Sequence, residues 1–121
     1  MRAKRTDKSQ AAIVKQLRQR GAQVIVTNFG NDFPDLLIGL AHWSLIEIKE
    51  PDGDLSRGQL QFLSDAKGRV GVATNFDDAL EIAAGVRHLT LLQKEAITKW
   101  LYLNHSQQSL SVRKFFKLIG K

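Results

Sequence analysis

Apolar residues recur along this chain with two different periods, one typical of helices and the other typical of strands. Ala12, Ile13 and Leu17 have helical spacing after the polar segment RTDKSQ, and Gly21 can end that helix. The β-branched run at 22–27 predicts a strand. The turn formers NFGNDFP that follow predict a loop.

Two further strands are predicted at 35–40 and 43–49, joined only by Ala41 and His42. A connection this short requires the two strands to be antiparallel. We therefore expect a hairpin whose first residue lies beside the end of its second strand.

The segment from 56 to 85 predicts a helix, a strand and a second helix. LSRGQLQFLSDAKG indicates a helix at about 56–66, RVGVAT a strand, and NFDDALEIAAG a helix that ends at Gly85. Residues 1–85 then form one α/β unit, a mixed four-stranded sheet with flanking helices.

The last part of the chain, 86–121, predicts a C-terminal helical extension. TLLQKEAITKWLYLNH and SLSVRKFFKLIGK indicate two helices joined at SQQ. So short an extension should pack on the sheet unit or on a partner, because it can bury little surface alone. The expected apolar faces are Leu92, Ala96, Trp100 and Leu103 on the first helix, and Val112, Phe115, Phe116 and Ile119 on the second.

Composition limits the chemistry that is available. The chain has 121 residues, which suits one compact core, and it has no cysteine. Disulfides and thiolate metal sites are therefore excluded, and His42, His88 and His105 are too scattered to suggest zinc. Any metal should be a hard ion bound by oxygen ligands.

No apolar run approaches the length of a membrane span, and the basic start lacks the apolar stretch of a signal peptide. We expect a cytoplasmic protein with no membrane partner and no small-molecule cofactor.

Charge is divided unevenly along the chain, whose net charge is +6. The net charge is +6 over 1–20, −6 over 21–85 and +6 over 86–121. An acidic centre between basic ends would suit a cation site in a protein that holds a polyanion. Alternatively, the charged ends only keep a small domain in solution.

The central acids include a group with the pattern of a catalytic site. Glu47 and Lys49 share one face of their strand. If the hairpin pairs position i with 82 − i, Asp35 lies opposite Glu47. Two carboxylates that lie this close repel unless a cation separates them, and their oxygens suit Mg²⁺ or Mn²⁺. Lys49 could position a water or neutralise charge on phosphate oxygens, so the set fits metal-assisted phosphodiester hydrolysis.

Each of these features also has a structural explanation. Pro-Asp is a common turn pair, and Glu-x-Lys on a strand is often a surface ion pair. The three acids that follow Lys49 fit a solvated turn better than metal ligation; they are Glu50, Asp52 and Asp54. The order of the features, with a helix after the second strand, favours the catalytic interpretation.

The segments FPDLLIG, LIEIKEPDGDLSRGQLQFL and VGVATNFDDAL resemble, in this order, the PD-(D/E)xK nuclease superfamily. Their spacing is similar to its VRR-NUC branch, the virus-type replication-repair nucleases, over about 6–83. The resemblance implies a restriction-endonuclease-like αβββαβ core over 1–85. It also implies Asp35 and Glu47 as metal ligands, the backbone carbonyl of Ile48 as a third, and Lys49 as the catalytic lysine.

The sequence departs from the family pattern at two places. The family usually has glycine just before Pro-Asp, whereas Asp32 and its neighbours intervene after Gly30. Many members carry a glutamate in the first helix, where this chain offers Gln10 and Asp7. Either of these could be a further ligand, both could be capping residues, or the site works with two carboxylates.

Gln59 matches the glutamine that the family places near its active site. It also forms a capping box with Ser56, in which it would only close the start of the helix. The positional match favours a role in the site, and the capping interpretation stays open.

The basic ends could hold backbone phosphates, which would position a nucleic acid without reading its sequence. The candidate contacts are Arg5, Lys8, Lys15, Arg18, Arg113, Lys114 and Lys117. We therefore expect a Mg²⁺- or Mn²⁺-dependent DNA endonuclease, and the resemblance implies branched DNA as substrate and a homodimer. The alternatives are an inactive nucleic-acid-binding module with a nuclease fold, and an interaction protein that docks through its tail.

Overall fold

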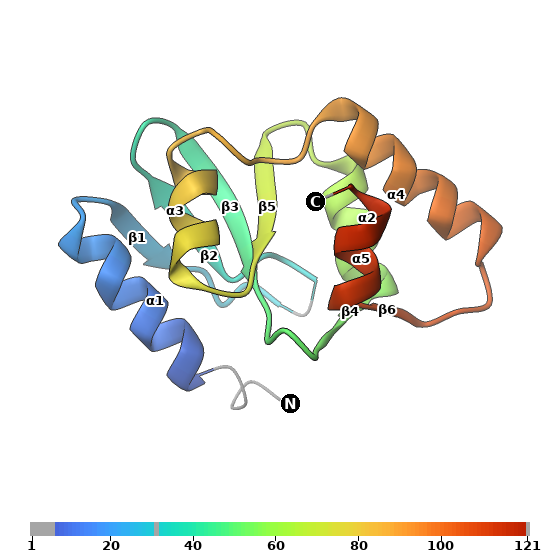
Figure 1. Cartoon of the computed structure of the whole chain (residues 1–121), viewed down its shortest axis with the longest axis horizontal. Helices are drawn as coiled ribbons and strands as arrows, with labels where there is room; N and C mark the ends of the chain where they lie inside the picture. Colours follow the sequence, from blue (N-terminus) through green and yellow to red (C-terminus); the bar gives the residue numbers. More distant parts are fainter. Residues whose placement is uncertain (1–6, 31, 121) are drawn as a thin grey trace.

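The computed structural model describes residues 7–30 and 32–120 (Figure 1). Its elements, in chain order, are α1 (Asp7–Gln19), β1 (Gln23–Val26), β2 (Leu36–Gly39), β3 (Trp43–Ile48), β4 (Asp54–Ser56), α2 (Arg57–Asp65), β5 (Arg69–Ala73), α3 (Phe76–Ala83), α4 (Leu91–Leu103), β6 (Ser109–Ser111) and α5 (Val112–Leu118). The predicted mixed α/β class is confirmed.

The main sheet has four strands in the order β1-β2-β3-β5. The hairpins β1–β2 and β2–β3 are antiparallel, and β5 lies parallel to β3. In the β2–β3 hairpin Leu36 pairs with Ile46 and Gly39 with Trp43, so position i pairs with 82 − i and residues 40–42 form the turn. The start of β2 therefore lies beside the end of β3.

Two hydrophobic clusters cover the two faces of this sheet, which Figure 1 shows between α1 and α3 on one side and α2, α4 and α5 on the other. The first core contains Ile46 and Ile48 of β3, and the second contains Val70 and Val72 of β5. Strand alternation explains the division, because successive side chains point to opposite faces. Glu47 lies between Ile46 and Ile48 and so faces the second core.

Helices α2 and α4 pack against each other in antiparallel directions, and a base at the start of each reaches the end of the other. Arg57 donates to the carbonyl oxygens of Leu101 and Asn104. Lys94 donates from Nζ to the carbonyl oxygens of Ala66, at 2.8 Å, and Gly68, at 3.1 Å. The last carbonyls of a helix have no partner within it, so both contacts satisfy groups that packing would otherwise leave unpaired.

The predicted apolar face of α4 is wrong at Leu92 and Leu103, whereas Trp100 packs against the second core. Leu92 and Leu103 are 76% and 66% exposed, whereas Ile97 is fully buried and Leu101 nearly so. Apolar residues occur on every side of this helix, so periodicity alone does not select the buried side. Packing on α2 selects it. The expected face of α5 is confirmed, because Phe115 and its apolar neighbours on that face pack in the second core.

A second, two-stranded sheet was not predicted. Asp54–Ser56 and Ser109–Ser111 pair antiparallel as β4 and β6, and Arg57 N–H donates to Gln108 O at 3.0 Å. The helix predicted from 109 therefore begins only at Val112. Three-residue strands leave no period to detect, so only the tertiary pairing defines them. Among the described residues no helix is long and apolar enough to cross a membrane.

Candidate active site at the end of strand β3

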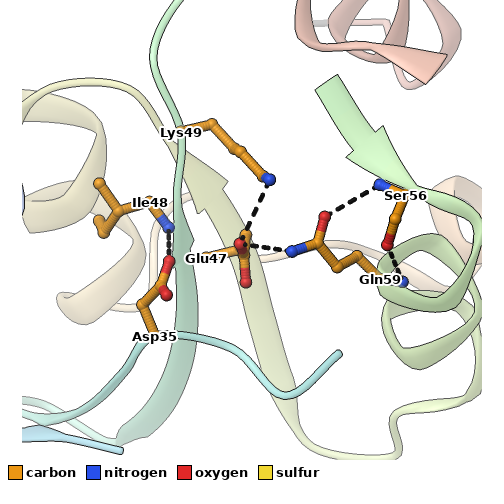
Figure 2. Close-up of polar contacts among 6 residues, drawn as sticks. All are labelled: Asp35, Glu47, Ile48, Lys49, Ser56 and Gln59. Atoms are coloured by element: carbon orange, nitrogen blue, oxygen red, sulfur yellow. Dashed lines mark hydrogen bonds and ion pairs between the residues drawn. The ribbon is translucent and has the colours of Figure 1, made fainter. Parts of the chain in front are cut away.

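Asp35 stands immediately before β2 and is held by backbone contacts on both sides. Its carbonyl oxygen accepts from Thr27 N–H at 3.0 Å, and its Oδ2 accepts from Ile48 N–H at 2.9 Å (Figure 2). Thr27 Oγ1 also donates to Pro34 O at 2.6 Å. The hairpin register thus brings the Asp35 carboxylate onto the backbone N–H of Ile48, one residue beyond Glu47, the residue that the sequence predicted to lie opposite it.

Glu47 and Lys49 form a buried ion pair at the end of β3. The two residues are 4% and 7% exposed, and Lys49 Nζ lies 3.7 Å from Glu47 Oε2. Backbone pairing extends past the strand, because Lys49 N–H donates to Ala73 O at 3.0 Å. Burying charged groups is costly unless they are paired, so a pair this deeply buried is not a solvated surface contact.

Gln59 joins helix α2 to Glu47 and caps the helix with the same amide. Its Nε2 donates to Glu47 Oε2 at 3.0 Å, and its Oε1 accepts from Ser56 N–H at 2.9 Å (Figure 2). The Ser56 hydroxyl completes the capping box by accepting from Gln59 N–H at 3.0 Å. The Gln59 amide therefore caps the helix through its oxygen and contacts Glu47 through its nitrogen, because the cap turns that nitrogen toward Glu47.

The backbone of Ile48 is oriented by the contact with Asp35. Its N–H points across to β2, and the N–H and C=O of a strand residue project to the same side. The Ile48 carbonyl oxygen therefore lies on the same side of β3 as the Asp35 carboxylate. Ile48 itself is buried in the first core, which fixes this stretch of backbone.

The first helix meets the site through a residue that the sequence did not single out. Ser9 Oγ donates to Glu50 Oε2 at 2.6 Å. Glu50 is therefore half-buried and hydrogen-bonded rather than part of a solvated turn, whereas Asp52 and Asp54 are exposed as expected. No local pattern marks Ser9, because its partner lies 41 residues further along the chain.

Gln10 lies on the side of α1 that faces β1. It lines a shallow hollow together with Val14, Lys15, Arg18 and Val26. The side chain of Asp7 lies outside the described residues. Within the described part of the chain, no group of three or more His, Cys, Asp or Glu side chains gathers in a way that could hold a metal ion.

The described donors nevertheless fit a hard divalent ion. Asp35 and Glu47 supply carboxylates, and Ile48 supplies a backbone carbonyl on the Asp35 side. Mg²⁺ is typically bound through one or two carboxylates and keeps several of its own waters, so it does not require a complete protein cage. A further ligand from the first helix stays a prediction, because the Asp7 side chain lies outside the described residues.

Asp32 packs against Gly58 in the first turn of α2. A Cβ placed on Gly58 would lie 2.3 Å from both Asp32 carboxylate oxygens, so glycine is what permits this approach. Phe33 also packs edge-on against Phe62 of α2, with ring centroids 5.2 Å apart. A negative charge beside the start of a helix is favourable. Asp32 and Phe33 thus fasten the loop before β2 to α2.

The predicted nucleic-acid contacts that the structure describes lie on helices on opposite sides of the main sheet. Lys15 and Arg18 are exposed on α1, and Arg18 uses one nitrogen to donate to Val24 O at 2.8 Å. The bases of the other group are exposed on α5, on the opposite side of the sheet (Figure 1); they are Arg113, Lys114 and Lys117. Arg5 and the side chain of Lys8 lie outside the described residues.

Comparison with known proteins identifies no relative: no family model, curated protein or solved structure matches this chain.

Proposed function

We propose that the chain is a divalent-metal-dependent nuclease with a restriction-endonuclease-like αβββαβ core. The observation that carries this proposal is the convergence of Asp35 Oδ2 on the backbone of Ile48, between the buried, paired side chains of Glu47 and Lys49. The order α1-β1-β2-β3-α2-β5, interrupted by β4, is consistent with that core. The resemblance to PD-(D/E)xK nucleases supports the same conclusion.

In this proposal each side chain has a defined task. Asp35, Glu47 and the carbonyl of Ile48 would hold Mg²⁺ or Mn²⁺, which when bound polarises a phosphate and lowers the pKa of a bound water. Gln59 keeps the Glu47 carboxylate in place through its amide. The Lys49 ammonium orients the attacking water or offsets negative charge on the phosphate oxygens.

The proposed reaction is hydrolysis in one step. The attacking water loses a proton to solvent as its oxygen bonds to phosphorus, the bond from phosphorus to a sugar oxygen breaks, and that sugar oxygen gains a proton. Exposed lysines and arginines on α1 and α5 would hold the neighbouring backbone phosphates. The resemblance to the VRR-NUC branch supports branched DNA as substrate and a homodimer as the active form.

The experiment is cleavage of flap, four-way-junction and linear DNA with Mg²⁺, with Mn²⁺ and with chelator. Lys49→Met removes the ammonium and keeps much of the volume, and Lys99→Met is the matched control, because Lys99 is exposed on α4. We expect metal-dependent cleavage that Lys49→Met abolishes and Lys99→Met preserves. Cleavage that survives in Lys49→Met, with folding checked by circular dichroism, would refute the assignment.

The second candidate is a nuclease-fold module that binds nucleic acid without cutting it. The observation that favours it is the lack of a third metal-binding side chain beside Asp35 and Glu47 within the described residues. Saturable DNA binding with no cleavage under any metal would decide for this candidate.

A further inference from the structure

A second polar hollow lies at the opposite end of the main sheet, where β3 and β5 begin. Its lining contains five bases, one tryptophan and one threonine, together with glycine and apolar residues, and no acidic residue. The polar members and the tryptophan are His42, Trp43, Lys67, Arg69, His88, Thr90 and Lys94. Ser44 pairs with Arg69 in the parallel register, so both strands start here. At about 3.3 Å per residue, β3 separates this hollow from Lys49 by roughly 20 Å.

No described carboxylate forms an ion pair with a lysine or arginine of this hollow. The ion pairs among the described residues are Lys49 with Glu47 and Arg87 with Glu81, so none involves Lys67, Arg69 or Lys94. The pKa of Lys94 is lowered, first by burial and then by the nearby charge of Lys67. The ammonium of Lys94 contacts only neutral carbonyl oxygens in the described structure. An anion would relieve the mutual repulsion of these bases.

Two residues that line this hollow each have a buried nitrogen with no partner among the described residues. Arg69 Nε and His88 Nδ1 are inaccessible to solvent and make no hydrogen bond to the described residues. Buried polar groups are nearly always hydrogen-bonded, and leaving one without a partner is costly. An arginine N–H always donates, and a histidine Nδ1 donates when it carries the proton. Because both atoms are closed to solvent, an acceptor-rich ligand in the hollow would meet them only after the side chains of Arg69 and His88 turn toward it.

Trp43 gives the hollow an exposed aromatic wall. Its side chain packs over Gly39, where a Cβ would lie 3.0 Å from the ring, and the residue is still 53% exposed. An exposed indole face is a platform on which a nucleobase can stack, and Arg and Lys bind phosphate by charge-assisted hydrogen bonds. The start of α4, a helix of 13 residues, adds its positive end through Thr90.

We infer that this hollow is a second nucleotide-binding site, in which Arg69, His88 and Lys67 hold a phosphate and Trp43 stacks on the adjacent base. The phosphate can belong to a free mononucleotide or to a nucleic-acid strand. A strand bound here would be anchored about 20 Å from the proposed catalytic carboxylates. The part of this inference that concerns a strand rests on the proposed function, whereas nucleotide binding does not.

The test measures binding without catalysis. Tryptophan fluorescence and calorimetry would follow titration with inorganic phosphate, a 5′-mononucleotide, and a short single-stranded DNA with and without a 5′-phosphate, all in chelator. The same titrations on Glu47→Gln keep the outcome separate from nuclease activity, because Glu47 does not line the hollow. The variants are Arg69→Gln and Trp43→Leu, with Lys99→Gln as the charge-matched control on the exposed surface of α4.

We expect saturable binding of the mononucleotide or the DNA, weakened about tenfold or more in Arg69→Gln and unchanged in Lys99→Gln. Trp43→Leu should remove the preference for a nucleotide over inorganic phosphate. DNA that binds more tightly than the mononucleotide would identify a strand as the ligand, and the reverse order would identify a free nucleotide.

Three results would overturn the inference. They are no saturable binding of any probe, equal weakening by Arg69→Gln and Lys99→Gln, and inorganic phosphate binding as tightly as the mononucleotide. If Arg69→Gln does not fold, nuclear magnetic resonance on the unmodified protein takes its place. Nucleotide must then shift the indole N–H signal of Trp43 and the ring signals of His88, and unchanged signals would count against the site.

Discussion

Replacing Gln59 by glutamate separates the two contacts that this side chain makes. Glutamate is common at the N3 position of a capping box, so its carboxylate can still accept a hydrogen bond from Ser56 N–H. The same substitution replaces the amide donor that faces Glu47 Oε2 at 3.0 Å by a second carboxylate oxygen. The helix cap is preserved, and only the contact with Glu47 is reversed from attraction to repulsion.

The expected cost follows from that geometry. A hydrogen bond to a charged group contributes about 1.5–3 kcal/mol, and this contribution is lost. Two unit charges about 3 Å apart repel by roughly 5 kcal/mol at an effective dielectric constant of about 20, and side-chain movement reduces this value. We therefore expect Gln59→Glu to lower the free energy of unfolding by about 2–5 kcal/mol in chelator. Ser56→Ala, which removes only the cap hydroxyl, should cost about 1 kcal/mol.

Urea unfolding with chelator and with Mg²⁺ or Mn²⁺ is the assay. A cation between the carboxylates offsets their repulsion, so the metal should stabilise Gln59→Glu more than the unmodified protein. Ser56→Ala should respond to metal as the unmodified protein does. The reasoning is refuted if Gln59→Glu is as stable as the unmodified protein in chelator, or if metal stabilises both variants equally.

Three further substitutions test contacts outside the carboxylate site. Arg57→Met removes the donors that hold the end of α4 and should lower the free energy of unfolding by about 2–4 kcal/mol in urea titrations; an unchanged value would mean that the tail packs without them. Gly58→Ala should destabilise by about 1–3 kcal/mol, against the usual helix preference for alanine, because its Cβ meets Asp32 at 2.3 Å. Adding Asp32→Ala should restore stability, and persistent loss would exclude this clash as the cause. Lys67→Gln should raise the pKa of Lys94 toward 10.5, measured by resonance titration of its ammonium. Because folding lowers the pKa of Lys94, its protonated form destabilises the folded state at pH values below that lowered pKa. The free energy of unfolding therefore rises as pH increases from the lowered pKa to 10.5, and this rise should be smaller in Lys67→Gln.

Much of the α/β core follows from local patterns. Ile46 and Ile48 alternate with Glu47 and Lys49, so strand β3 and its two faces could be predicted without any knowledge of the fold. The short link predicted an antiparallel hairpin that brings Asp35 near the end of β3, whereas the exact register depends on a turn of three residues, 40–42, between paired Gly39 and Trp43. The glycine after the first helix and the capping residues before α2 set element ends by local chemistry.

Contacts between distant segments could not be predicted in this way. Ser9 binds Glu50, and Arg57 binds Leu101 at the end of α4, over sequence separations of 41 and 44 residues. No local pattern in the sequence predicts either contact. The strands β4 and β6 exist only as a pair, because each is too short to have a period of its own. The buried side of α4 was predicted wrongly at Leu92 and Leu103 for a related reason: the apolar residues of this helix lie on every side of it.

The sequence by itself determined most of the secondary structure of the core and the antiparallel hairpin that brings Asp35 near the end of β3, because strand alternation and a short connection are local constraints. The tertiary structure alone decided that the Gln59 amide serves Ser56 and Glu47 at once. It also decided that bases from three separate segments, with Trp43, share one hollow at the far end of the sheet. Burial and donor orientation depend on the packing of all the elements together, and no local pattern encodes them.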